Sequence, residues 1–210
     1  MKHKKAYIFD FDGTLVDSMD NFADIAGTVI AKHYGVSFEY AKSRYIETTG
    51  LPFCEQIELI FPNNQKNKMA VKTYEAKKLE KYFEEDFYPD VNETINFLKK
   101  RGIKVVVSSN NYQKVIDEYV EKKNVIFDSV LGYREGFAKG KDHFDFIKNT
   151  YNFENRDLVF IGDSLKDAER AYLNDIDFIA KIGLFSREDF KAHLKEGSRI
   201  INSLKELQEN

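Results

Sequence analysis

The stretch Asp10-Phe11-Asp12-Gly13-Thr14-Leu15-Val16-Asp17-Ser18 follows directly on the apolar run Ala6-Tyr7-Ile8-Phe9. The apolar run predicts a buried strand, and the stretch behind it places two carboxylates, a glycine and a hydroxyl group on the loop where the strand ends. Loops held by a buried element often carry binding and catalytic residues. Aspartate and glycine also favour ordinary turns for local backbone reasons. By itself, the stretch is therefore either an acidic turn or a reaction centre.

The composition is that of a folded protein with one sizeable core. The chain has 210 residues, 42% of them hydrophobic, and a formal net charge of −3. This balance provides no basic field to hold a nucleic-acid backbone, so we expect no nucleic-acid partner. Cys54 is the only cysteine, and we expect a buried thiol in a reducing compartment. No apolar stretch suggests a signal peptide or a membrane span, which predicts a cytoplasmic protein without membrane contact.

Residues 17–86 have a helical and very polar pattern. Apolar residues recur at helical spacing from Phe22 to Ile30, and no later segment of this block shows the alternation typical of a strand. The turn Thr48-Thr49-Gly50-Leu51-Pro52 interrupts the block. A helical block inside a chain that otherwise alternates strand and helix predicts an inserted α-helical domain spanning 17–86.

The remaining residues, 1–16 and 87–210, alternate apolar runs with helical segments. After the first strand, the runs predict strands at 104–107, 126–131, 158–161, 178–182 and 200–201. The run Leu158–Ile161 is wholly apolar, as expected for a strand covered by helices on both faces. We therefore predict an α/β fold, a doubly wound, mostly parallel Rossmann-like sheet that carries the helical insert.

Polar residues follow four of these strands. Besides the opening stretch, Ser108 and Ser109 follow the second strand, Lys139 lies in the loop after the third, and Gly162-Asp163-Ser164-Leu165-Lys166-Asp167 follows the fourth. Ligands of such sheets bind beyond the carboxyl ends of the strands. The four stretches are thus expected to meet at one edge of the sheet.

The acidic residues of this edge form a hard oxygen site. Asp163 and Asp167 are spaced i, i+4 at the start of a predicted helix, so their carboxylates can share one face with Asp10 nearby. Taken alone, Asp163 is also typical of a helix cap. Two like charges at this spacing repel each other, and Mg²⁺ is the cation that suits oxygen ligands. The histidines are scattered and are not expected to bind metal: His3, His33, His143 and His193.

A hydroxyl group and a lysine complete the predicted chemistry. Ser108 and Lys139 opposite a metal could hold the oxygens of a phosphoryl group. Lys141 is the competing lysine. We favour Lys139 because Gly140 and a helix-capping Asp142 follow it, which would set its ammonium group at the rim of the site while Lys141 points outward.

The four ordered motifs resemble those of the haloacid dehalogenase-like (HAD) hydrolase superfamily over nearly the whole chain. Asp17-Ser18 and the helical insert are similar to the C1-capped branch that contains phosphoglycolate phosphatases and beta-phosphoglucomutases. Two features depart from that pattern. Lys139 lacks the Lys-Pro-x-Pro context common in this branch, and Pro89-Asp90 stands where Pro-Gly is usual.

The resemblance implies a Mg²⁺-dependent phosphatase that hydrolyses a small phosphomonoester metabolite through an aspartyl-phosphate. It implies that Asp10 is the nucleophile and that Asp12 is the general acid and then the general base. Further roles follow for the other motif residues: metal binding by Asp10, the backbone carbonyl of Asp12 and Asp163, support from Thr14 and Asp167, and phosphate binding by Ser108, Ser109 and Lys139.

Two other functions remain open from the sequence. A phosphomutase of the beta-phosphoglucomutase type shares every core residue and needs groups in the insert that grip a second phosphate, for which Arg44 is the nearby candidate. A non-catalytic binding module with the same fold is the other. The resemblance implies that substrate specificity comes from the insert and from the loop that leads into it, here Asp17, Ser18, Asn21, Thr48 and Thr49. The sequence determines neither the substrate nor the oligomeric state.

Overall fold

The computed structural model describes residues 4–209. The chain divides into two compact units, one of residues 1–16 and 87–210 and the other of residues 17–86. The first unit holds every strand in the described part of the chain, and the second consists of helices and their connections. Each unit buries apolar side chains of its own.

The first unit is built on a parallel sheet. Within residues 4–209, six strands pair in the order β3-β2-β1-β4-β5-β6, and every pairing is parallel. The strands are β1 (Ala6–Phe9), β2 (Lys104–Tyr112), β3 (Ser129–Tyr133), β4 (Leu158–Gly162), β5 (Asp177–Lys181) and β6 (Arg199–Ile201). From β1, the chain adds β2 and then β3 on one side of the sheet. It then returns to the other side of β1 and adds β4, β5 and β6 in order. This doubly wound α/β topology confirms the predicted fold class.

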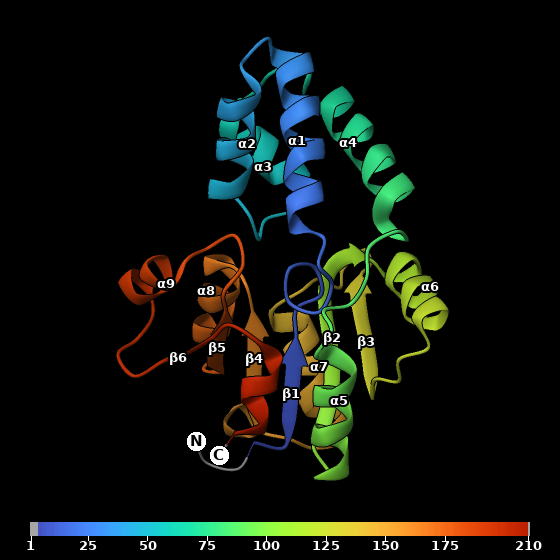
Figure 1. Ribbon diagram of the computed structural model, residues 1–210, viewed down its shortest axis with the longest axis vertical. Coiled ribbons are helices and arrows are strands. Elements are labelled where there is room, and N and C mark those ends of the chain that lie inside the picture. Colours follow the sequence, from blue (N-terminus) through green and yellow to red (C-terminus); the bar gives the residue numbers. More distant parts are fainter. Residues whose placement is uncertain (1–3, 210) are drawn as a thin grey trace. The chain divides into compact units, whose positions relative to one another are not determined.

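Helices cover the two faces of this sheet (Figure 1). They are α5 (Val91–Lys100), α6 (Gln113–Lys123), α7 (Lys141–Tyr151), α8 (Leu165–Leu173) and α9 (Arg187–His193), with 3₁₀ turns at Asn155–Asp157 and Leu204–Gln208. Phe144 of α7, Ala168 of α8 and Phe190 of α9 pack in one core cluster with Ile8 and Phe160 of the sheet. These three helices therefore share one face.

The strand register decides which loop residues lie side by side. Phe9 of β1 is aligned with Val107 of β2 and with Ile161 of β4. Side chains alternate between the faces of a strand, and aligned residues point to the same face. Asp10 and Ser108, one residue beyond this level, therefore emerge together on the face covered by α7.

Two predicted strands and one helix cap differ from the structure. β2 continues to Tyr112, well past Val107, and β3 begins at Ser129 instead of Ile126. Ile126 is 72% exposed, so an apolar residue outside the core misled the pattern. The Asp142 side chain does not cap α7, whose N-cap position is Gly140, but accepts a hydrogen bond from the backbone N–H of Ala138 at 3.0 Å.

The second unit is a helical bundle. It contains α1 (Met19–Tyr34), α2 (Phe38–Glu47), α3 (Phe53–Ile60) and α4 (Asn67–Tyr82). Its core includes Phe53, whose ring stacks on Tyr74 with centroids 3.9 Å apart. The two ends of the unit meet, because the backbone N–H of Asp17 donates to the carbonyl oxygen of Asp86 at 3.0 Å.

The expectation of a buried Cys54 is wrong. Cys54 lies in the first turn of α3, where Phe53, Gln56 and Ile57 are the buried residues, and it is exposed. Its position on the outer side of an amphipathic helix explains the difference. None of the helices in residues 4–209 has the length and apolar character needed to cross a membrane.

Candidate active site

The loop after β1 folds back tightly on itself. The Asp10 N–H donates to the carbonyl oxygen of Ile161 at 2.8 Å, which continues the pairing of β1 with β4. The Phe11 carbonyl oxygen then accepts hydrogen bonds from the N–H groups of Leu15 and Val16, both at 2.9 Å. Gly13 has a φ of +77°, a conformation that favours glycine. The opening stretch is therefore a compact turn that fixes its two carboxylates at the edge of the sheet.

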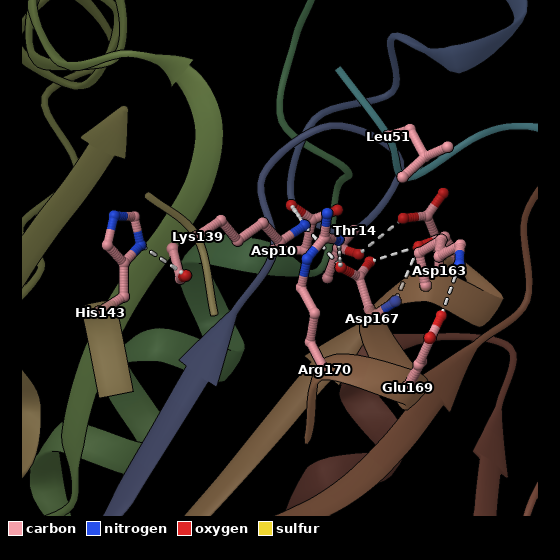
Figure 2. A network of polar contacts seen from close by, with 12 residues as sticks. Asp10, Thr14, Leu51, Lys139, His143, Asp163, Asp167, Glu169 and Arg170 are labelled. Carbon is pink, nitrogen blue, oxygen red and sulfur yellow. Dashed lines mark hydrogen bonds and ion pairs between the residues drawn. The ribbon is translucent and has the colours of Figure 1, made fainter. Parts of the chain in front are cut away.

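Lys139 joins two of the acidic motifs. Its Nζ lies 2.6 Å from Asp10 Oδ1 and 2.7 Å from Asp167 Oδ1, and all three side chains are at most 10% exposed. Figure 2 shows this ammonium group between the two carboxylates. Arg170 adds a further contact to Asp167, with Nη1 3.3 Å from Oδ1. Lys139 is thus buried among the acids, deeper than the rim position predicted for it.

The charges of this cluster shift one another's pKa values. Burial raises the pKa of Asp10 to about 6, although the neighbouring Lys139 ammonium acts in the opposite direction. Burial alone would lower the pKa of Lys139, but the carboxylates of Asp10 and Asp167 outweigh burial and raise it. Lys139 is therefore a fixed positive charge, whereas Asp10 holds its proton more tightly than an exposed aspartate does.

Asp163 has an unsatisfied oxygen. Thr14 Oγ1 donates to Asp163 Oδ1 at 3.3 Å, whereas Oδ2 is buried without any hydrogen-bond partner. Burial and the nearby carboxylates of Asp10 and Asp167 raise the pKa of Asp163 well above its ordinary value. A cation next to Oδ2 would stabilise the ionised carboxylate, because an unpaired charge is costly to bury.

The geometry of the three carboxylates suits a metal ion. Asp10, Asp163 and Asp167 are all buried, and each offers a ligand oxygen within 4.8 Å of the others. Within residues 4–209, no histidine or cysteine belongs to such a group. An all-oxygen donor set with an orphaned oxygen is typical of Mg²⁺ sites. That the histidines bind no metal stays a prediction, and His3 lies outside the described residues.

The turn between β4 and α8 is shaped for close approach. A Cβ atom at Gly162 would lie only 2.7 Å from Cβ of Asp167, so this position requires glycine. Ser164 is the N-cap of α8: its Oγ accepts from the Asp167 N–H at 3.2 Å and donates to Asp167 Oδ2 at 2.8 Å. The helix cap is Ser164, which leaves Asp163 outside the helix and directed to the acidic cluster.

Ser108 lies at the same edge, at the level of Asp10. It is fully buried, and its Oγ lies 2.8 Å from Nδ1 of His143 on α7. Burial lowers the pKa of His143 to about 4, so its imidazole is neutral at pH 7. The sequence predicted only that His143 lies in a helix and does not bind metal. Its spacing with Phe144 and Ile147 on the buried side of α7 was the sequence signal that it enters the core.

Asp12 and Ser109 are tied to the end of β2. Asn111 Nδ2 donates to Asp12 Oδ2 at 2.6 Å, and Ser109 Oγ accepts from the Asn111 N–H at 3.1 Å. Asn111 is a site residue that the sequence did not reveal. The strand was expected to end at Val107, and nothing in an Asn-Asn pair distinguishes a partner of Asp12 from a loop residue.

The two candidate lysines lie in very different surroundings. Lys139 Nζ is bonded to Asp10, whereas Lys141 pairs with Asp145 one turn along α7 and its side chain is 75% exposed. The geometry therefore favours Lys139 over Lys141 as a ligand-binding cation.

The candidate residues of the helical unit are engaged within that unit. Thr48 Oγ1 donates to the carbonyl oxygen of Arg44 at 2.9 Å and lies 3.1 Å from Gln56 Oε1. Thr49 Oγ1 donates to the carbonyl oxygen of Tyr45 at 3.2 Å. Arg44 forms an ion pair with Glu47 on the same helix. These contacts explain the C-terminal end of α2 and disfavour substrate recognition by the threonine hydroxyls.

Comparison with known proteins agrees with the geometry of the site. The model of the family "Haloacid dehalogenase-like hydrolase" matches residues 7–181, a span that begins in β1 and ends with β5. That span includes each of the four motifs. A solved structure, a haloacid dehalogenase-like family hydrolase from Streptococcus pneumoniae, has the same fold, with a TM-score of 0.79, 20% identity and coverage of 99% of this chain and 98% of that one.

Curated relatives are similar over most of this chain. A haloacid dehalogenase-like hydrolase domain-containing protein of Arabidopsis thaliana is 26% identical over 78% of this chain, and the match spans only 64% of that relative's length. A phosphoglycolate phosphatase of Haemophilus influenzae is 25% identical over 76% of this chain and 77% of its own. The family model, which covers most of this chain, shows that the chain belongs to the haloacid dehalogenase-like hydrolase family.

Proposed function

We propose that this protein is a Mg²⁺-dependent phosphatase that hydrolyses a small phosphomonoester through an aspartyl-phosphate on Asp10. The observation that carries the proposal is the buried group of Asp10, Asp163 and Asp167, with Asp163 Oδ2 unpaired and Lys139 bound to Asp10. Three mutually repelling buried carboxylates are costly to the fold, so we do not expect them in a protein that has lost its catalytic activity. The family membership and the phosphoglycolate phosphatase relative support the same reaction class.

Asp10, Asp163 and the backbone carbonyl of Asp12 would hold the metal, and Asp167 would assist. Bound Mg²⁺ would reduce the repulsion between an anionic nucleophile and an anionic phosphate. Asp167 is already bonded to Lys139 and Ser164, so its part is to keep the lysine and the metal ligands in place. Thr14, which donates to Asp163 Oδ1, orients that carboxylate.

The reaction would use Asp10 and Asp12 in two steps. A carboxylate oxygen of Asp10 attacks phosphorus, the bond from phosphorus to the ester oxygen breaks, and Asp12 gives its proton to the leaving alkoxide. Asp12, now a carboxylate, takes a proton from water, whose oxygen attacks the same phosphorus. The bond between phosphorus and the Asp10 oxygen breaks, so inorganic phosphate leaves and the Asp10 carboxylate is regenerated. Asn111, which donates to Asp12 Oδ2, holds the carboxyl group in one orientation.

Ser108 and Lys139 would bind the phosphoryl oxygens. Both are buried, and Lys139 already lies within hydrogen-bond distance of the nucleophile. A fixed ammonium group and a hydroxyl donor stabilise the charge that spreads over these oxygens during transfer. Ser109 is less suited, because successive side chains of a strand point to opposite faces, so its side chain does not share the face of Ser108 and Asp10.

The substrate is proposed only as a small phosphorylated metabolite, with the helical unit of residues 17–86 as a cap that selects it. A cytoplasmic location also stays a prediction. Hydrolysis is favoured over a phosphomutase reaction, because Arg44, the candidate for gripping a second phosphate, is engaged with Glu47. Incubation with beta-glucose 1-phosphate and a bisphosphate primer tests this choice: glucose 6-phosphate would reveal a mutase, and free phosphate alone would exclude one.

Phosphate release from p-nitrophenyl phosphate, measured with Mg²⁺ and with EDTA, tests the proposed function. We expect metal-dependent turnover that falls at least about thousandfold in Asp10→Asn, because the nucleophile is lost. Asp117→Asn is a matched control, since it makes the same change at an exposed position of α6. Absence of metal-dependent turnover would favour a non-catalytic module, and full activity of Asp10→Asn would refute the mechanism. A panel of phosphorylated metabolites, including phosphoglycolate, then defines the substrate.

A further inference from the structure

The contact between Ser108 and His143 joins a motif residue to a helix outside the motifs. Ser108 Oγ and His143 Nδ1 are 2.8 Å apart, and both residues are fully buried. His143 lies in the first turn of α7, four residues after Lys139. A dashed line in Figure 2 marks this contact of the His143 imidazole. The mechanism above uses Ser108 but gives this histidine no part.

The direction of the proton in this contact decides what Ser108 can do. A serine hydroxyl has one proton and two acceptor lone pairs. If Ser108 donates its proton to Nδ1, only lone pairs remain to face a phosphoryl oxygen, and the two groups repel. If Nδ1–H donates to Oγ, the Ser108 proton is free for the phosphoryl oxygen. The tautomer of His143 therefore determines whether Ser108 can act as a donor.

The other ring nitrogen indicates which tautomer is present. His143 Nε2 is buried and has no hydrogen-bond partner. A proton on Nε2 would leave a buried N–H unpaired, which is rare in proteins, whereas an unpaired acceptor is tolerated better. Phe137, whose ring centroid lies 4.6 Å from that of His143, provides an apolar neighbour. A hydrogen bond of His143 with the Gly132 backbone acts against burial and raises the pKa of the ring, whereas Nε2 has no partner within hydrogen-bond geometry.

We propose that His143 is a positioning residue that donates from Nδ1 to Ser108, so that the Ser108 hydroxyl proton points to the phosphoryl site beside Asp10. The register of β1 and β2, which aligns Phe9 with Val107, brings Ser108 to the level of Asp10. This inference rests on the proposed phosphatase function for its consequence. The tautomer itself can be tested without any activity.

Nuclear magnetic resonance of the full-length, ¹⁵N-labelled protein at pH 7.5 reads the tautomer directly. The imidazole signals of His143 are assigned by their loss in His143→Asn. We expect a protonated Nδ1 and an unprotonated Nε2. The opposite tautomer would overturn the proposal, because Ser108 would then donate to the ring.

Two variants of similar size test the consequence for phosphate binding. His143→Asn keeps an N–H donor close to the position of Nδ1, whereas His143→Leu keeps the volume without a donor. We expect His143→Leu to lose about tenfold in kcat/KM and to bind inorganic phosphate about tenfold more weakly, the effect of one misdirected hydrogen bond. His143→Asn should stay within about threefold of wild type. Equal losses in both variants, or none in either, would refute the donor role.

A double-mutant cycle separates this role from mere packing. In a Ser108→Ala background, His143→Leu should cause no further loss of kcat/KM, because no hydroxyl remains to orient. A full additional loss would overturn the proposal. If the wild-type protein shows no Mg²⁺-dependent turnover, the proposed function is refuted instead. The tautomer measurement would still decide how the Ser108 hydroxyl is oriented.

Discussion

The loops at the edge of the sheet and the Thr48-Thr49 turn of the helical unit both place polar groups next to the end of a regular element. In the turn, each threonine hydroxyl donates to a carbonyl oxygen of its own helix. At the sheet edge, Asp163 Oδ2 is buried without a hydrogen-bond partner. The threonine hydroxyls therefore find their hydrogen-bond partners within the helical unit, whereas a carboxylate oxygen at the sheet edge has none. Polar groups that the fold leaves unsatisfied indicate where a ligand belongs.

The largest effect that follows from this comparison concerns Asp163. Asp163→Asn removes the charge that the proposed Mg²⁺ needs but keeps the hydrogen bond of Thr14 to Oδ1. We expect turnover to fall at least about thousandfold at saturating substrate. Steady-state phosphate release over a range of Mg²⁺ concentrations measures this loss. Recovery of wild-type turnover at high Mg²⁺ would show only weakened metal affinity and would argue against an essential charge.

Ser108→Ala should have the next largest effect. Removal of the hydroxyl takes away one donor to the phosphoryl group and leaves His143 Nδ1 without its partner at 2.8 Å. We expect a loss of about hundredfold in kcat, typical of deleting one donor of an anion hole. Ser109→Ala is the matched control in the neighbouring position, with an expected loss below about threefold. Similar losses in the two variants would contradict the assignment of Ser108.

The unsatisfied carboxylate should also affect stability without metal. The pKa of Asp163 is raised by burial and by Asp10 and Asp167, so the folded state binds a proton more tightly than the unfolded chain. The stabilising contribution of the protonated group is therefore present at low pH and is lost as the pH rises through the folded-state pKa. In EDTA at pH 8, we expect Asp163→Asn to be more stable than wild type by about 1 kcal/mol or more.

Urea unfolding at pH 4 and pH 8 measures this difference. The gain of Asp163→Asn over wild type should shrink at pH 4, where the wild-type carboxyl keeps its proton. Mg²⁺ should stabilise the wild type at pH 8 and leave the variant unchanged. A variant that is less stable than wild type at pH 8 in EDTA would contradict the view that Asp163 is unsatisfied.

The smallest effect is expected in the turn of the helical unit. Thr48→Val removes a hydroxyl that bonds within α2 and lies 3.1 Å from Gln56 Oε1. We expect a loss of about 1 kcal/mol in unfolding free energy with kcat changed less than about twofold. Thermal unfolding and phosphate release, measured on the same preparation, test both parts. A large change in KM with unchanged stability would instead assign Thr48 to substrate binding.

The sequence by itself determined the alternation of strands and helices and the order of the four motifs. Hydrophobic period and turn residues are local properties, so they predicted β1, β4 and the parallel sheet well. A local pattern could not determine that Ile126 lies outside the core or that β2 runs on to Tyr112. The position of Cys54 on the exposed side of α3 likewise depended on which face of the helix is packed.

Tertiary structure alone decided which polar groups meet. The contacts of Lys139 with Asp10, of Asn111 with Asp12, and of His143 with Ser108 join residues 35 to 129 positions apart. Sequence separation carries no information on such contacts, because the register of the parallel strands sets them. The opening stretch Asp10–Ser18 predicted a site. The register of β1 with β2 and β4 determined which residues of the other loops lie beside that stretch.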